Sequence, residues 1–70
     1  MDKEKIKKYL KDLPISWEIK GDTLYLWRET KGKEYYTELY EEDLKDNNLE
    51  KNLNFVLKNE LELEGGVYHE

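Results

Sequence analysis

The sequence predicts a small α+β domain: an N-terminal helix, a three-stranded antiparallel meander and a C-terminal helix, with both helices on one face of the sheet. Residues 15–40 alternate apolar and polar side chains in three segments, which is typical of half-buried strands. Gly21-Asp22 and Lys31-Gly32 separate these segments and predict two-residue hairpins. Apolar residues at helical spacing flank the region on both sides and predict the two helices.

The two turns also predict which side chains share a face of the sheet. The first hairpin sets Ile19 opposite Leu24 and Trp17 opposite Leu26, so one face is aliphatic. On the other face, the second hairpin pairs aromatic and acidic residues: Trp27 with Tyr36, Tyr25 with Glu38, and Thr23 with Tyr40.

The first helix is predicted from Asp2 to Leu13. Asp2 is a suitable N-cap, and Pro14 disfavours helical geometry at the residue before it. Four apolar residues repeat at helical spacing and form its buried stripe: Ile6, Tyr9, Leu10 and Leu13.

The segment after the strands is predicted as an acidic loop or a single helical turn over residues 41–46, anchored by Leu44. A second helix follows from about Asn48 to about Leu63, and Gly65-Gly66 is a natural stop. The alternation of Glu and Leu in residues 60–64 leaves an alternative open, in which the helix ends near Lys58 and a fourth edge strand follows. Glu is depleted in strands and is a good helix former, which favours the longer helix.

Length and composition limit the classes of protein that this chain can belong to. Seventy residues make one domain with a thin core, which we place at residues 1–64 with a C-terminal tail at 65–70. The chain has no cysteine, no apolar run long enough to cross a membrane and no signal-peptide pattern, so we expect a soluble cytoplasmic protein. The net charge is −5: residues 1–40 carry nine basic and eight acidic groups, whereas residues 41–70 carry three and nine. Abundant Lys, Glu, Asn, Leu and Tyr with no Ala or Gln suggest an AT-rich genome, such as that of a low-GC bacterium or its phage.

Few residues suit catalysis or metal binding. The single histidine, His69, is next to the C-terminus, and the single serine, Ser16, has no histidine near it in sequence. Glu18 and Glu38 flank Tyr25 on the sheet, but we expect exposed carboxylates there to keep ordinary pKa values. The acidic run after the third strand lacks the alternating ligands and the glycine of a calcium loop. The sequence therefore predicts no enzyme activity, no cofactor and no metal site.

The aromatic face of the sheet has two interpretations. Its members, Tyr25, Trp27, Tyr36 and Tyr40, are residue types that favour strands and stabilise them through cross-strand pairs. Exposed aromatic patches on small proteins also mark contact surfaces or homodimer seams. The sequence leaves both interpretations open.

The order of the elements resembles that of double-stranded-RNA-binding domains. Those domains hold phosphates with lysines at the start of their second helix, where this sequence has acidic residues, so direct nucleic-acid binding is not expected. The same organisation, over residues 2 to about 63, also resembles small acidic phage-encoded anti-CRISPR proteins that inhibit Cas9. That resemblance implies a domain that occupies a basic DNA-reading groove and faces its arginines with carboxylates.

The hypothesis for function is a non-enzymatic protein-binding module, a phage or accessory inhibitor that occupies a basic nucleic-acid-binding groove of a host defence or DNA-handling protein. Its partner would be a protein with a basic surface. The residues assigned to partner binding are Glu38, Glu41, Glu42, Asp43, Asp46, Glu50, Tyr36 and Tyr40, with Tyr25 and Trp27 as sheet-face contacts. The alternative is a structural homodimer that buries the aromatic face.

Overall fold

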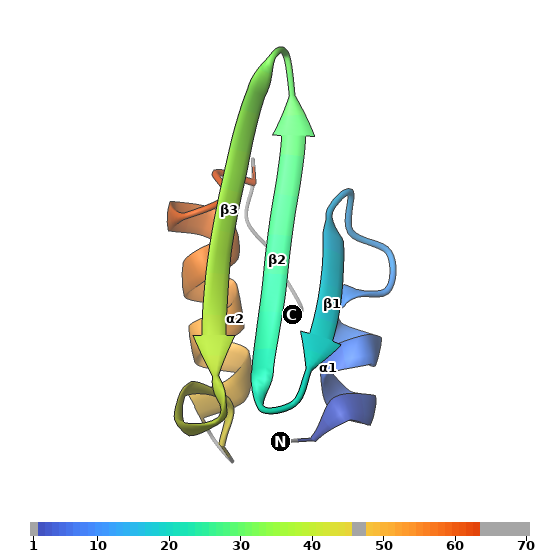
Figure 1. Cartoon of the computed structure of the whole chain (residues 1–70), viewed down its shortest axis with the longest axis vertical. Coiled ribbons are helices and arrows are strands. Elements are labelled where there is room, and N and C mark those ends of the chain that lie inside the picture. Colours follow the sequence, from blue (N-terminus) through green and yellow to red (C-terminus); the bar gives the residue numbers. More distant parts are fainter. Residues whose placement is uncertain (1, 46–47, 64–70) are drawn as a thin grey trace.

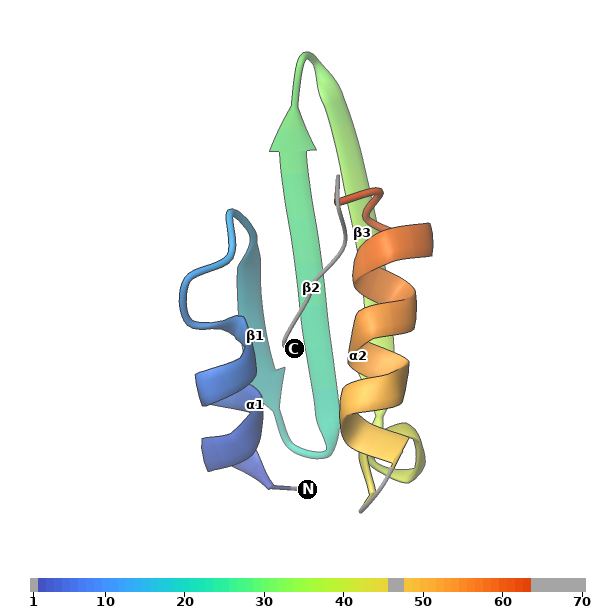
Figure 2. The same cartoon turned by 180° about the vertical axis from the view of Figure 1, so that it is seen from behind.

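The computed structural model describes residues 2–45 and 48–63 and has the predicted α+β architecture in two layers. Figures 1 and 2 show the sheet as one layer and both helices as the other. In chain order the elements are α1 (Lys3–Leu10), β1 (Ser16–Lys20), β2 (Thr23–Thr30), β3 (Lys33–Tyr40), the 3₁₀ turn η1 (Glu41–Leu44) and α2 (Asn48–Asn59).

The three strands form one antiparallel sheet in the order β1-β2-β3, and the predicted register is confirmed. In the first turn Gly21 has a φ of 59°, which fits a type II′ turn with glycine at its first central position. In the second turn both central residues have positive φ, 49° at Lys31 and 78° at Gly32. This geometry matches the right-handed twist of the strands, and it places a side-chain-bearing residue in the left-handed region.

The core lies between the aliphatic face of the sheet and the two helices. Leu24 and Leu26 on the central strand are fully buried, and Ile6, Leu53 and Leu57 cover them from the helical layer. No polar or charged residue is buried within the described part of the chain. All of the recognition chemistry that the described residues offer therefore lies at the surface.

Helix α1 ends at Leu10, three residues before the predicted end at Leu13. Asp2 caps the helix as predicted, because its side chain accepts a hydrogen bond from the backbone N–H of Lys5 at 3.1 Å. Beyond Leu10 the chain tightens, and the N–H of Leu13 donates to the carbonyl of Leu10 at 3.2 Å. Pro14 disfavours helical geometry at Leu13, so the helix cannot extend to that residue. Leu13 nevertheless packs against the core.

Helix α2 ends at Asn59, close to the alternative end near Lys58, so the longer helix to about Leu63 was wrong. The fourth strand of that alternative was wrong for residues 60–63, which are neither helix nor strand. Leu61 and Leu63 are both buried, whereas residues two apart on a helix point in nearly opposite directions. The chain leaves the helix so that both can reach the core: the N–H of Leu61 donates to the carbonyl of Val56, and Glu62 takes a positive φ of 50°. The proposed tail, 65–70, lies outside the described residues.

Arg28 on β2 fixes this segment after the helix. Its guanidinium donates to the carbonyls of Leu61 at 2.8 Å and Glu62 at 2.9 Å, and it lies 5.8 Å from the centre of the Tyr35 ring. The sheet therefore supplies the donors that hold the end of the helical layer.

Candidate functional site on the open face of the sheet

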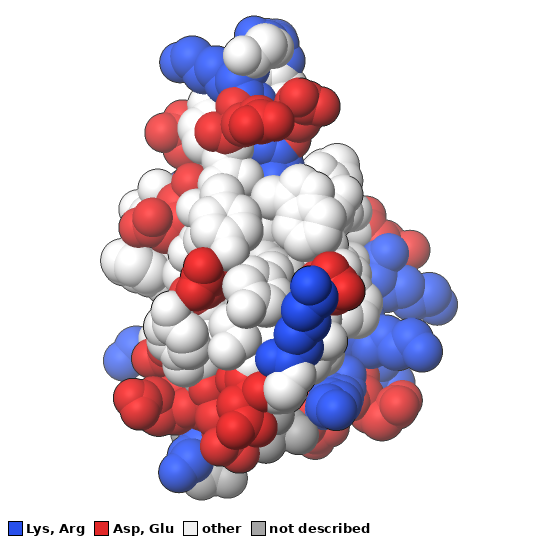
Figure 3. Space-filling model, in the orientation of Figure 1, with Lys and Arg blue, Asp and Glu red and all other residues white. Residues whose placement is uncertain are grey.

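The face of the sheet that points away from the helices, here called the open face, carries the predicted aromatic residues. Trp27, Tyr36 and Tyr40 are 39%, 54% and 51% exposed, and Tyr25 lies half-buried among them. The rings of Tyr25 and Tyr36 are stacked with centroids 6.5 Å apart and planes 29° from parallel. Figure 3 shows uncharged side chains as a band across this face. Exposed aromatic rings gathered on a protein of this size form a candidate contact surface.

Glu38 ties two of these tyrosines together. The hydroxyl of Tyr36 donates to one oxygen of its carboxylate at 2.6 Å, and the hydroxyl of Tyr40 donates to the other at 2.7 Å. All three side chains project from alternate positions of β3 and so lie on the same face. The spacing of two residues on either side of Glu38 is visible in the sequence, whereas the predicted contacts of Glu38 were only those to its cross-strand neighbours.

These hydrogen bonds change the acidity of all three groups. The bonds from Tyr36 and Tyr40 lower the pKa of Glu38, so the expectation of an ordinary pKa for this carboxylate was wrong. Conversely, the bond to Glu38 raises the pKa of Tyr36 to about 12 and also raises the pKa of Tyr40. At neutral pH, Glu38 is therefore a fixed anion that accepts hydrogen bonds.

Acidic side chains outnumber basic ones on the open face. The strands direct four carboxylates and one lysine to it: Glu18, Glu29, Glu34, Glu38 and Lys20. Figure 3 shows acidic side chains toward the β2–β3 turn at one end and over η1 at the other. Glu29 and Glu34 do not stand out when charge is counted along the chain, although the predicted strand register already placed both on this face.

The acidic residues predicted after β3 have different environments. Glu41 and Glu42 are exposed on η1, next to the end of the open face. Asp43 has a structural role: its carboxylate accepts a hydrogen bond from the N–H of Tyr40 at 3.1 Å, and its carbonyl accepts one from the side chain of Asn52 at 2.7 Å. Asp46 lies outside the described residues.

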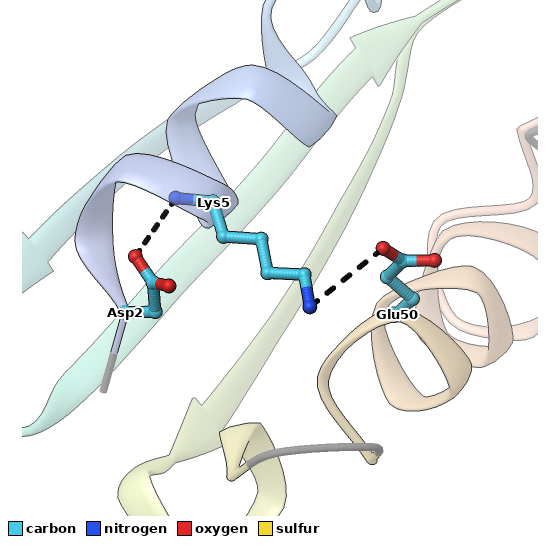
Figure 4. A network of polar contacts seen from close by, with 3 residues as sticks. All are labelled: Asp2, Lys5 and Glu50. Carbon is cyan, nitrogen blue, oxygen red and sulfur yellow. Dashed lines mark hydrogen bonds and ion pairs between the residues drawn. The ribbon is translucent and has the colours of Figure 1, made fainter.

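Glu50 lies in the helical layer, separate from the open face. It sits in the first turn of α2 and forms an ion pair with Lys5 of α1 at 4.0 Å, with the two side chains 60% and 48% exposed. Figure 4 shows this pair bridging the two helices. An exposed pair of this kind contributes at most about 1 kcal/mol to stability. The structure thus places Glu50 in the helical layer, on the other side of the sheet from the side chain of Glu38.

The described residues also bear on metal binding and on membrane spanning. Residues 2–45 and 48–63 contain no group of three or more His, Cys, Asp or Glu side chains placed to hold a metal ion. None of their helices has the length and apolar character needed to cross a membrane. Ser16 is exposed on β1 opposite Trp27, and His69 lies outside the described part.

Comparison with known proteins found no matching family model, no matching curated protein and no matching solved structure.

Proposed function

We propose that this protein is a non-enzymatic binding module whose open face engages a basic surface of a protein partner. The observation that carries the proposal is the combination on one face of exposed aromatic rings with four carboxylates and one lysine. Aromatic rings contribute much of the binding energy at protein interfaces, and carboxylates speed association with a basic partner. The same charge repels phosphate backbones, so the expected partner is a protein and not a nucleic acid.

The narrower form of this proposal is an inhibitor, encoded by a phage or accessory element, that acts in the host cytoplasm. Its target is a basic groove in which a defence or DNA-handling protein holds nucleic acid. The acidic end of the open face, where Glu38 precedes exposed Glu41 and Glu42, supports this form because it can replace the phosphates that such a groove binds.

Charge favours such a partner over a second copy of this chain. In a twofold homodimer the same patch meets itself, so an acidic surface that includes Glu18, Glu34 and Glu38 would face an equally acidic surface. Like charges brought together at an interface cost binding energy. Sedimentation of the wild type beside Trp27→Ser tests the homodimer: a dimer would shift toward monomer in the variant, whereas a monomer would keep its mass.

The proposal is tested by capture from a host lysate on the immobilised protein at low salt, followed by a salt step. The open-face variant Glu18→Lys/Glu34→Lys should lose the proteins that the wild type releases with salt. A matched variant, Glu4→Lys/Glu60→Lys, makes the same change in net charge at exposed positions of α1 and just beyond α2, and it should retain them. Equal retention by both variants, or equal loss, would contradict a binding role of the open face.

A further inference from the structure

One row of side chains crosses all three strands of the open face and places an aromatic ring between two carboxylates. Glu18 on β1 pairs with Tyr25 on β2, which pairs in turn with Glu38 on β3. Neighbouring strands are about 4.8 Å apart, so the backbones of the two glutamates are separated by about 10 Å with Tyr25 midway. The ring of Tyr36, stacked with that of Tyr25, extends the aromatic surface beside the row.

Glu38 is held in place with hydrogen-bonding capacity to spare. A carboxylate offers about four acceptor positions, and the hydroxyls of Tyr36 and Tyr40 use one on each oxygen. Both oxygens therefore keep a position for a further donor. Neither Glu18 nor Glu38 forms an ion pair with another residue in the described part of the chain.

We propose that this row, Glu18–Tyr25–Glu38, is the seat for an arginine side chain of the protein partner. This inference rests on the proposed function and specifies which basic group the open face receives. A guanidinium stacks flat on a tyrosine ring while its edge donates two parallel hydrogen bonds to a carboxylate. The ring supplied here is Tyr25, the fixed carboxylate is Glu38, and the carboxylate of Glu18 adds electrostatic attraction from the opposite side.

Arginine fits this seat better than lysine because the seat is planar and has two acceptor oxygens side by side. An ammonium group is a compact, strongly hydrated point charge that neither stacks on a ring nor binds both oxygens in fork geometry. On the strands, the basic residue nearest to this row in the register is Lys20, which lies on the same face, opposite Thr23. Its charge opposes an incoming guanidinium, so Lys20→Gln should strengthen arginine binding about two-fold.

The test is an NMR titration of the isotopically labelled protein at low salt with a short peptide that alternates arginine and glycine. Matched peptides replace arginine by lysine or by uncharged citrulline. The arginine peptide should shift the amide signals of Glu18, Tyr25, Tyr36 and Glu38 most and should bind more tightly than the lysine peptide, whereas the citrulline peptide should not bind. Glu38→Gln, which keeps the shape of the side chain, should weaken arginine binding about ten-fold. Glu4→Gln removes the same charge from an exposed position of α1, in the helical layer, and should change binding less than two-fold.

Two results would overturn the seat, and they differ in what they imply for the proposed function. If arginine and lysine peptides bound equally and Glu38→Gln weakened binding no more than Glu4→Gln did, the attraction would be a general effect of charge, so the seat would fail while a face for basic partners would stand. If no basic peptide bound even at low salt, both the seat and the proposed function would fail. Retained signal dispersion in Glu38→Gln would show that the variant is folded.

Discussion

Removing the guanidinium of Arg28 should destabilise the fold measurably, because one side chain holds the segment that follows α2. Arg28→Met keeps much of the aliphatic stem but removes both hydrogen bonds to the carbonyls of Leu61 and Glu62 and the contact with the ring of Tyr35. A hydrogen bond to a charged group contributes about 1.5–3 kcal/mol, and the exposed one of this pair is expected to contribute less. The cation–π contact adds about 0.5 kcal/mol.

From these contributions, and because water can solvate the freed carbonyls in part, we expect Arg28→Met to lower the free energy of unfolding by about 2 kcal/mol. For a domain of this size that corresponds to a fall in Tm of about 8–16 °C, measurable by circular dichroism. The control is Lys33→Met on the same hairpin, which removes an exposed charge with no described partner and should change stability by less than about 0.5 kcal/mol. Equal stability of the two variants would refute the assigned role of Arg28.

Three further predictions concern the open face and its hairpin. Glu38→Gln should lower the pKa of Tyr36 from about 12 toward its ordinary value of 10.0, since the hydrogen bond to the carboxylate is the main cause of the rise; an alkaline titration followed by tyrosinate absorbance would detect this, and an unchanged value would contradict that cause. Lys31→Asn should raise the midpoint of urea unfolding, because asparagine tolerates the positive φ of 49° better than lysine does; a lower midpoint would argue against this turn geometry. Glu34→Lys places a positive charge opposite Glu29, so it should stabilise the fold by a few tenths of a kcal/mol and weaken the binding of basic peptides. If urea unfolding and peptide titration showed that stability and affinity both rise or both fall, a role of Glu34 in recognition would be contradicted.

Much of the fold followed from local signals in the sequence. The two turns and the alternation of side chains fixed every strand pair, because shifting the register by one residue would have turned Leu24 and Leu26 out of the core. The ends of the helices were harder to predict. The end of α2 depends on Arg28, which is distant in sequence, and on the burial of both Leu61 and Leu63, and no local pattern encodes either contact.

The candidate site was predictable in position but not in detail. Register alone placed Tyr25, Trp27, Tyr36 and Tyr40 on one uncovered face. Recognising that Glu38 is fixed by two tyrosines required side-chain geometry, and finding that Glu50 pairs with Lys5 required the position of α2 relative to α1. A count of charge along the chain does not reveal the acidic face, because residues 1–40 are nearly neutral as a whole. The strands bring the glutamates of this part together on one face.

The arrangement of charge on the open face is hard to explain by stability alone. Glu29 lies directly opposite Glu34 in the sheet, a like-charge pair that costs stability, although a lysine at either position would give a favourable pair. Local conflicts of this kind are expected where a surface also serves recognition. The hydrogen bonds from Tyr36 and Tyr40 to Glu38 also favour a role in recognition. They orient a carboxylate that would otherwise sample several rotamers in water. A partner that binds this oriented carboxylate has less side-chain entropy to overcome, so these tyrosines contribute pre-organisation as well as contact area.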